Sequence, residues 1–119
     1  MMEIRVENLD DLVLVECRGR FVKSDSVFQL RNVVMAQHSP VVVLDLSEVE
    51  AMGGGGVGML KFLEHWAREQ KIHLKLFNPS KSVIEGLVLN RCILDFEIAG
   101  FHEMMGLLAH ADNRYSLAA

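Results

Sequence analysis

The strongest feature of the sequence is an apolar run at residues 41–46, in which Asp45 is the one charged residue. A run of this kind is typical of a central strand that is covered on both faces. Residues 53–58 follow shortly and read Gly-Gly-Gly-Gly-Val-Gly. Because glycine tolerates a positive φ and lets the backbone approach a neighbour closely, these residues predict a turn. An amphipathic pattern then continues to Gln70, so the segment predicts a buried strand, a glycine turn and a helix.

Within that helix the apolar residues fall on one broad arc of a helical wheel, which predicts a core-facing side. The arc contains Met59, Leu60, Phe62, Leu63, Trp66 and Ala67. Val57 lies apart from this arc, on the polar side of the first turn. This position indicates either a contact surface beside the glycines or packing under a neighbouring loop, and the sequence leaves both alternatives open.

The rest of the chain alternates between strand and helix patterns. Alternation of polar and apolar residues predicts an antiparallel hairpin that ends at Gly19, a further strand and an edge strand, at residues 3–7, 12–18, 72–77 and 95–99. Helical spacing predicts three more helices, at residues 24–37, 81–90 and 102–111. Ser24 or Asp25 is the expected N-cap of the first of these helices, and Ser80 is that of the second.

This order of elements predicts an α/β fold at the borderline with α+β, with a mixed central sheet of about five strands flanked by about four helices. A chain of 119 residues is long enough to form one domain with a real core. We expect that domain to span residues 1–112, and we expect residues 113–119 to form a frayed tail.

Composition narrows the cellular setting and the classes of partner. The net charge is −4 and no basic block occurs, which argues against binding to nucleic acid or to an anionic membrane surface. The longest apolar stretch is too short to span a bilayer, and the N-terminus has no apolar signal core. Cys17 and Cys92 form no Cys-x-x-Cys motif and are expected to be reduced, buried thiols. We therefore expect a cytoplasmic protein.

The glycine run contains a Gly-x-Gly-x-x-Gly pattern at Gly53, Gly55 and Gly58, but its surroundings argue against a dinucleotide site. The next predicted strand ends in Asn78-Pro79, not in an acidic residue that would hold a ribose. The chain is also short for a doubly wound domain, and four adjacent glycines satisfy many patterns by chance. No Gly-Lys-Ser or Gly-Lys-Thr follows, which excludes a phosphate-loop NTPase.

No catalytic or metal-binding set can be assembled from the remaining polar residues. The five histidines are scattered and form no His-x-x-x-His pair, so no metal or other cofactor is expected. Asp45 and Ser47 close the central strand, where open α/β sheets often place functional groups. Ser24 and Asp25 are better explained as helix caps, and no serine stands at a recognisable spacing from a histidine. The sequence therefore predicts a protein without enzymatic activity.

The element order and several short motifs together resemble the STAS domain, the family of sulphate transporters and anti-sigma factor antagonists. The resemblance covers nearly the whole chain and is strongest at residues 43–52, which resemble the family's central strand and its D-L-S-x-V motif. Further matches follow in the family's order: Gly56-Val-Gly58 for G-L-G, Asn78-Pro79-Ser80 for N-P-S, Leu87-Val-Leu89 for L-x-L, and Phe96-Glu-Ile98 for F-E-I. The resemblance implies the same fold that the hydrophobic pattern predicts.

The chain departs from the family where the family is regulated. STAS antagonists typically carry D-S-S-G or D-S-T-G in the central turn, and the first hydroxyl is their phosphorylation site. Here residues 53–56 are all glycine, so Gly54 stands at the phosphoacceptor position and cannot be phosphorylated. The acidic residue of the family's G-E-L-D is also missing from residues 19–22. Arg91 stands where the family often has glycine after a helix, and Asn90 is expected to take the left-handed conformation instead.

Three kinds of function compete. The resemblance implies a regulatory adaptor that captures an anti-sigma factor or a kinase-like protein, and without the hydroxyl it would stay competent for binding or answer to another signal. The second is a small-ligand module that holds an anion, a nucleotide or a lipid headgroup at the amide-rich turn. An enzyme ranks last, because no acid, base or nucleophile is assembled.

Both binding modes place the site at the turn and the start of the following helix, at Gly53, Gly54, Gly55, Gly56, Val57 and Gly58. Secondary candidates are Ser24, Asp25, Asp45, Ser47 and Ser80. The three serines among them are the expected exposed positions for phosphate control if it has moved away from Gly54. We expect a monomer or a weak dimer.

Overall fold

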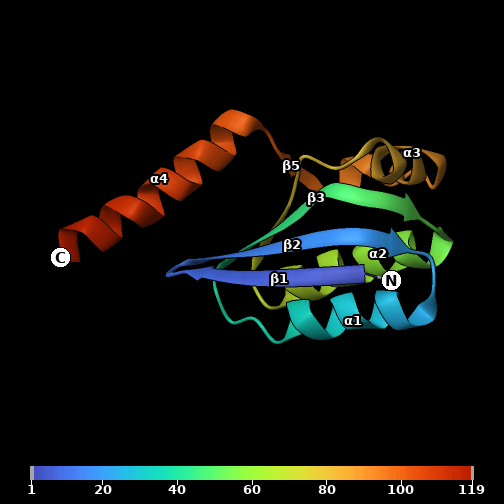
Figure 1. Cartoon of the computed structure of the whole chain (residues 1–119), viewed down its shortest axis with the longest axis horizontal. Helices are drawn as coiled ribbons and strands as arrows, with labels where there is room; N and C mark the ends of the chain where they lie inside the picture. The colour runs from blue at the N-terminus through green and yellow to red at the C-terminus, as the bar shows by residue number, and fades with distance from the viewer. Residues whose placement is uncertain (1, 119) are drawn as a thin grey trace.

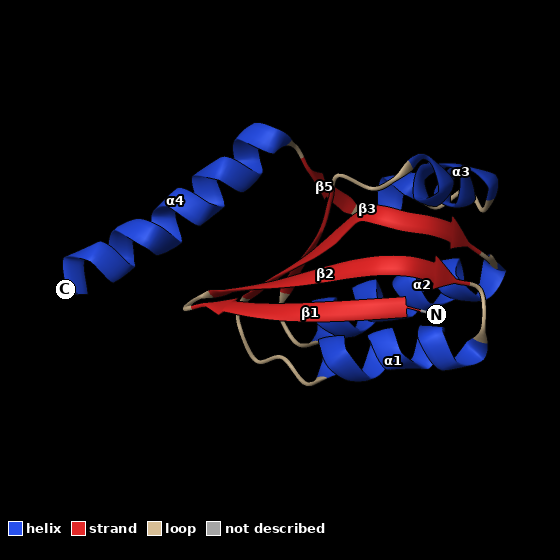
Figure 2. Cartoon of the chain, in the orientation of Figure 1, coloured by secondary structure: helices blue, strands red, loops and turns tan. Residues whose placement is uncertain are grey.

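A computed structural model shows one mixed five-stranded sheet within residues 2–118, with β3 at its centre (Figures 1 and 2). The structure describes the backbone of these residues and the side chains of residues 2–109. In spatial order the strands are β1 (Met2–Leu9), β2 (Leu12–Phe21), β3 (Val41–Met52), β4 (His73–Phe77) and β5 (Glu97–Ala99). β1 and β2 form an antiparallel hairpin, and the other neighbouring pairs are parallel. The predicted hairpin, central strand and edge strand are confirmed.

Helices connect the strands and pack on the sheet. They are α1 (Ser24–Met35), α2 (Gly54–Glu69), α3 (Lys81–Leu89) and α4 (Phe101–Ala118), with a turn of 3₁₀-helix at Ile93–Asp95. α1, α2 and α3 contribute buried side chains to one core cluster with the sheet, whereas the start of α4 contributes to a second cluster. The predicted α/β architecture, a mixed sheet flanked by four helices, is therefore confirmed within the described residues.

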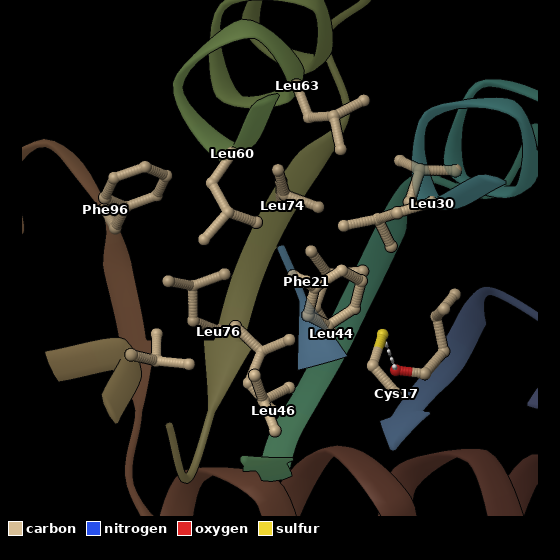
Figure 3. Close-up of a cluster of buried hydrophobic side chains, with 14 of the residues drawn as sticks. Cys17, Phe21, Leu30, Leu44, Leu46, Leu60, Leu63, Leu74, Leu76 and Phe96 are labelled. Atoms are coloured by element: carbon tan, nitrogen blue, oxygen red, sulfur yellow. Dashed lines mark hydrogen bonds between the residues drawn. The ribbon is translucent and has the colours of Figure 1, made fainter. Parts of the chain in front are cut away.

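The main core lies between the sheet and the helices α1 and α2. Figure 3 shows Leu44 and Leu74 of the sheet facing Leu30 of α1 and Leu60 and Leu63 of α2. None of these side chains is more than 4% exposed. Full burial of a leucine contributes about 1.5–3 kcal/mol relative to an exposed position, so this layer supplies much of the driving force for folding.

The two faces of β3 have different neighbours. Val42 and Leu44 belong to the main core, whereas Val43 lies in the second cluster with Leu12 of β2 and Met104 of α4. Val42, Val43 and Leu44 are all fully buried. The first half of β3 is thus covered on both faces, as its apolar run predicts.

β2 and β3 are longer than the hydrophobic pattern predicts. β3 continues beyond residue 46 to Met52, because the residues that follow still pair with β2 and still bury Val49. β2 likewise continues through Gly19, which has a φ of 116° at a shift in the register between β2 and β3. A positive φ favours glycine, so Gly19 allows a bulge in the strand. The prediction that Gly19 ends this strand was wrong.

At α3 the predicted cap is confirmed and the predicted left-handed residue is corrected. The Ser80 hydroxyl caps the helix and accepts a hydrogen bond from the N–H group of Val83 at 3.3 Å. After the helix, Arg91 takes the positive φ, 56°, whereas Asn90 keeps a φ of −93°. Asn90 stays near the helical conformation, where its Nδ2 donates a hydrogen bond to the carbonyl oxygen of Gly86 at 2.7 Å.

At α1 the predicted cap is wrong. The N-cap residue is Lys23, and no side chain makes a capping hydrogen bond there. Ser24 and Asp25 lie one and two positions later, in the first turn of the helix. The carboxylate of Asp25 still lies near the positive end of the helix dipole, a placement that stabilises a helix without capping it.

α4 leaves the body of the domain and extends away from the sheet (Figure 1). Met104 near its start is buried, as predicted, and Leu107 and Leu108 pack beside it. The helix runs to Ala118, beyond the predicted end at residue 111, and the side chain of Ala111 lies outside the described residues. The division of the chain at residue 112 stays a prediction. Between residues 2 and 118, no helix is long and apolar enough to cross a membrane.

Candidate functional site

The four glycines begin α2 and do not form a turn. Gly53 is the N-cap residue with a φ of −85°, and the helix starts at Gly54. The N–H groups of Gly56 and Val57 donate hydrogen bonds to the carbonyl oxygen of Gly53, at 3.0 and 3.1 Å. Within residues 2–118, Gly19 is the one glycine with a positive φ. The predicted turn was therefore wrong, and left-handed backbone does not explain the glycine run.

Gly56 is required by close packing. A Cβ atom at this position would lie 2.9 Å from Cγ of Met52 and 3.0 Å from the carbonyl oxygen of Phe21. Real Cβ atoms are rarely found so close to a backbone oxygen. Gly56 thus lets the first turn of α2 sit directly on the ends of β2 and β3, where Gly53 donates a hydrogen bond to the same Phe21 oxygen at 3.1 Å.

Gly54, Gly55 and Gly58 have no such structural role. A Cβ atom at any of the three would have no atom within 4 Å, and all three residues are exposed. Glycine inside a helix costs about 1 kcal/mol relative to alanine. The fold therefore gains nothing visible from these glycines, and together they leave bare backbone at the start of α2, an end that no side chain caps.

Val57 is part of the core and not of a contact surface. Its side chain is 2% exposed, and it lies against α3, where a Cβ atom on Gly86 would be 3.2 Å from its Cγ2. Of the two alternatives, packing is correct, but the neighbour that covers Val57 is the helix α3 and not a loop. The helical wheel places Val57 on the polar side of α2. It is nevertheless buried, because α3 covers a second side of this helix.

A shallow apolar groove of about 460 Å³ lies beside the bare glycines, between α1 and α2. Its lining includes Val22, Phe28, Arg31, Gly55, Gly58 and Phe62. The three apolar side chains among these are between 46% and 52% exposed. The sequence assigned Phe62 to the core-facing arc of its helix, and the structure corrects this. The available signal was Phe28, which does not share the helical spacing of Val27, Leu30 and Val34, the buried residues of α1.

Asp45 and Ser47 lie together, but away from the glycines. The Ser47 hydroxyl donates a hydrogen bond to Oδ1 of Asp45 at 2.7 Å, and the Ser47 N–H group donates to the same oxygen at 3.0 Å. They line a polar hollow of about 310 Å³ over β1, β2 and β3, whose other members include Glu16 and Arg18. Because side chains alternate along a strand, this hollow is on the sheet face opposite Leu44 and Leu46.

The remaining candidates are divided between the two helix starts. Ser24 is exposed and lines the groove, whereas Asp25 lies on a different side of α1. Ser80 is half-buried, and its hydroxyl donates a hydrogen bond to the carbonyl oxygen of Val49 at 2.7 Å. Ser47 is also half-buried, so of the three serines expected to be exposed only Ser24 is so.

Neither cysteine is a candidate nucleophile. Both thiols are buried, as predicted, and both are free. Burial, together with the negative charges of Asp45 and Glu16, raises the pKa of the Cys17 thiol to about 12. Burial also raises the pKa of Cys92. A thiol protonated at neutral pH is a poor nucleophile and a poor metal ligand. In the described part of the chain, no three histidine, cysteine or acidic side chains gather as metal ligands.

Solved structures of anti-sigma factor antagonists share this fold. SpoIIAA in its unphosphorylated form is 15% identical, with a TM-score of 0.70 over 91% of this chain and 97% of that protein. The phosphorylated form of SpoIIAA from Bacillus is 14% identical, with a TM-score of 0.66 over 89% and 99%. An anti-sigma factor antagonist from Mycobacterium paratuberculosis is 21% identical, with a TM-score of 0.70 over 82% and 85%. At these identities the likeness establishes the fold.

Sequence comparison gives the family. No curated protein sequence matches the chain. The STAS domain family, however, matches residues 3–109, which include the first three helices and all five strands except the first residue of β1. The family resemblance drawn from the short motifs is thereby confirmed, and the chain belongs to the STAS domain family.

Proposed function

We propose that this STAS domain is a non-enzymatic regulatory module that binds an anti-sigma factor or a kinase-like protein through the start of α2. The observation that carries the proposal is the bare surface formed by Gly54, Gly55 and Gly58. The fold does not require glycine at these positions, and glycine is a poorer helix former than alanine, most clearly at Gly58 inside the helix. A partner that approaches the helix backbone closely would account for all three.

The neighbouring surface supports a protein partner. Val22, Phe28 and Phe62 expose large apolar side chains around the same groove. Grouped apolar side chains of this kind mark interaction sites in proteins that are otherwise well packed. Several similar solved structures are those of anti-sigma factor antagonists, and that name is consistent with a protein partner. We place the module in the cytoplasm, as a monomer or weak dimer without a cofactor.

Control by phosphate at the family position is absent in this proposal. Gly54 stands where the family resemblance places the phosphoacceptor hydroxyl, and glycine has no hydroxyl to phosphorylate. The module is then permanently competent for binding at this position. Ser24 is the exposed serine closest to the groove and is the position at which phosphate control would have to act if it has moved.

A photo-crosslinking experiment identifies the partner. A benzophenone amino acid is placed at Gly55 and, as a control, at the exposed Glu85 of α3, and crosslinked proteins are identified by mass spectrometry in native extract. We expect an anti-sigma factor or a kinase-like protein from the Gly55 position and not from Glu85. Equal capture from both positions, or no protein of these classes, would contradict the proposal.

A matched pair of variants then tests the surface with the purified partner. Gly54→Asp adds a charge where the family carries phosphate and should weaken binding at least about tenfold, whereas Gly54→Ser should bind nearly normally. Asp near the positive end of the helix dipole is stabilising, so neither variant should melt below the wild type. Undiminished binding by Gly54→Asp would remove the start of α2 from the interface. Native mass spectrometry with nucleotides tests the alternative of a small-ligand module.

A further inference from the structure

The groove between α1 and α2 contains one charged side chain, and the described structure gives that side chain no acidic partner. Arg31 is half-buried in the groove wall, where its guanidinium carbon lies 4.8 Å from the centre of the Phe28 ring. Its nitrogens contact Oδ1 of Asn32, at 3.2 and 3.3 Å. No carboxylate lines the groove, and Arg31 makes no ion pair with any described residue. A fixed guanidinium in an apolar wall is suited to an incoming carboxylate.

The ends of two helices add to this positive character. Phe21 and Met52 are paired at the ends of the parallel strands β2 and β3, so α1 and α2 both begin at the same end of the sheet. Neither start carries a side-chain cap. The positive ends of both helix dipoles therefore lie at one end of the groove, which is lined there by Val22 and Gly55. Asp25 lies in the first turn of α1 and offsets that end in part, whereas the first turn of α2 has no acidic residue.

The shape of the groove suits a helix. From Gly55 to Phe62, α2 rises about 10 Å at 1.5 Å per residue, which is about two helical turns. A bound helix that anchors itself with residues i, i+4 and i+7 spans the same length. Gly55 and Gly58 are neighbours along the groove and leave space in which a second helix can approach the α2 backbone.

We propose that this groove binds an amphipathic helix of a protein partner, with the apolar residues of that helix between Phe28 and Phe62 and a carboxylate of that helix on Arg31. The inference rests on the proposed function, because it requires that this face binds a protein. It adds the secondary structure and the charge of the segment that the face recognises.

Two other occupants fit less well. A second copy of the chain, docked by the same face about a two-fold axis, would bring Arg31 near its own counterpart with no carboxylate in either groove to pair with it. A fatty acid has the required chemistry, but ligand sites bury most of the surface of a small ligand, and this groove is open along its length.

Peptide selection tests the proposal directly. A displayed library of helical peptides of about 12 residues, with apolar residues at i, i+4 and i+7 and the other positions varied, is selected against the wild-type chain and against Arg31→Glu. We expect the wild type to enrich aspartate or glutamate at one position beside the apolar stripe. Arg31→Glu should enrich lysine or arginine at that same position, because the charge preference follows the groove. If the wild type and Arg31→Glu enrich the same charge at that position, the carboxylate of the bound helix does not contact Arg31, and this part of the proposal is overturned.

A matched pair of leucine variants locates the binding site. Gly58→Leu adds a side chain to the lining of the groove, where there is space for it, and Lys61→Leu adds the same side chain to α2 outside the groove. An enriched peptide should bind Lys61→Leu as it binds the wild type and should lose at least about tenfold in affinity for Gly58→Leu. Thermal melting verifies that both variants fold. Equal affinity for the two variants, or amide shifts confined to another face in NMR spectra, would overturn the proposal.

The competing occupants give different results. Laurate that shifts the groove signals, together with a library that yields no binder, would assign the groove to an acyl chain. Self-association that Gly58→Leu abolishes would assign it to a second copy, and either result overturns the proposal. Failure here leaves the Gly54→Asp experiment untouched. If peptides bind the groove and Gly54→Asp still binds its partner normally, the groove remains a helix-binding site. The proposed function, in which the start of α2 binds the partner, is then contradicted.

Discussion

The starts of α2 and α3 follow neighbouring parallel strands, but the protein builds them in opposite ways. α3 begins with Ser80, whose hydroxyl accepts from Val83 N and donates to the carbonyl oxygen of Val49. Ser82 then donates to the carbonyl oxygen of Glu50 at 2.9 Å. α2 begins with bare backbone and no cap. Side chains therefore fasten the start of α3 to the domain and leave the start of α2 accessible, as the proposed binding of a partner at α2 requires.

We expect the largest effect at Gly56, the glycine of α2 that close packing requires. Gly56→Ala places a Cβ atom 3.0 Å from the Phe21 carbonyl oxygen, and overpacking of this kind costs about 1–3 kcal/mol. We expect a lower midpoint in urea denaturation with an unchanged slope. A variant as stable as the wild type would show that the helix start can shift, and that Gly56 belongs with its bare neighbours.

Loss of the α3 cap should have the next largest effect. Ser80→Ala removes the cap and leaves the carbonyl oxygen of Val49 without that hydrogen bond, so the free energy of unfolding should fall by about 1–2 kcal/mol. Urea denaturation measures the change, and Ser24→Ala, at a serine that makes no capping bond, is the control with little expected effect. Equal losses in both variants would remove the contrast between the two helix starts.

The bare glycines should respond in the opposite direction. Gly58→Ala has open space and a helical φ, so alanine should raise the free energy of unfolding by about 0.5–1 kcal/mol. Thermal melting measures the gain, and Gly55→Ala should behave alike. A loss of stability at either position would reveal a structural role that the surroundings of these residues do not show.

The smallest effect concerns the start of α4, where Lys75 pairs with Glu97 of β5 and Glu103 of α4. Lys75 Nζ lies 2.8 Å from Glu97 Oε2 and 2.8 Å from Glu103 Oε2. The hydrogen bond from Lys75 lowers the pKa of Glu97 below its ordinary value of 4.5. The associated stability is present above that value and is lost as the pH falls through the lower pKa of the folded state.

A pair of melting curves measures this contribution. Because Glu97 is largely exposed, the fall in melting temperature on acidification should be small, and Glu97→Gln should reduce it slightly. A Glu97→Gln protein with the same acid sensitivity as the wild type would show that the ion pair contributes nothing at this helix start.

Much of the fold follows from the sequence pattern, because buried apolar residues recur with the period of the helix or strand that carries them. The run at residues 41–46 identifies the central strand, and Ser80 before an apolar helix identifies a cap. The pattern failed where alternation is weak and where a helix is covered on two sides. Residues 47–52 alternate only weakly and resemble a loop, although they continue β3. Val57 falls on the polar side of a helical wheel and is buried all the same, because a single apolar arc cannot describe a helix that has neighbours on two sides.

The candidate site was harder to predict. Glycine in a sequence does not say whether it serves a left-handed backbone, close packing or an open surface, and the run contains the second and third cases side by side, at Gly56 and Gly58. Phe62 likewise fits an apolar arc whether or not another element covers it. Deciding between these cases requires the positions of neighbours such as Phe21, which are distant in the sequence.

The two serines of α3 also bear on how the protein avoids aggregation. β4 pairs with β3 only from Val41 to Asp45, so the rest of β3 has no strand on that side. The N–H group and the hydroxyl of Ser80 bond to the carbonyl oxygens of Leu46 and Val49, and the Ser82 hydroxyl bonds to that of Glu50. An open strand edge is a template for pairing with another chain. The helix start thus occupies an edge that would otherwise be free to recruit a strand from a second molecule.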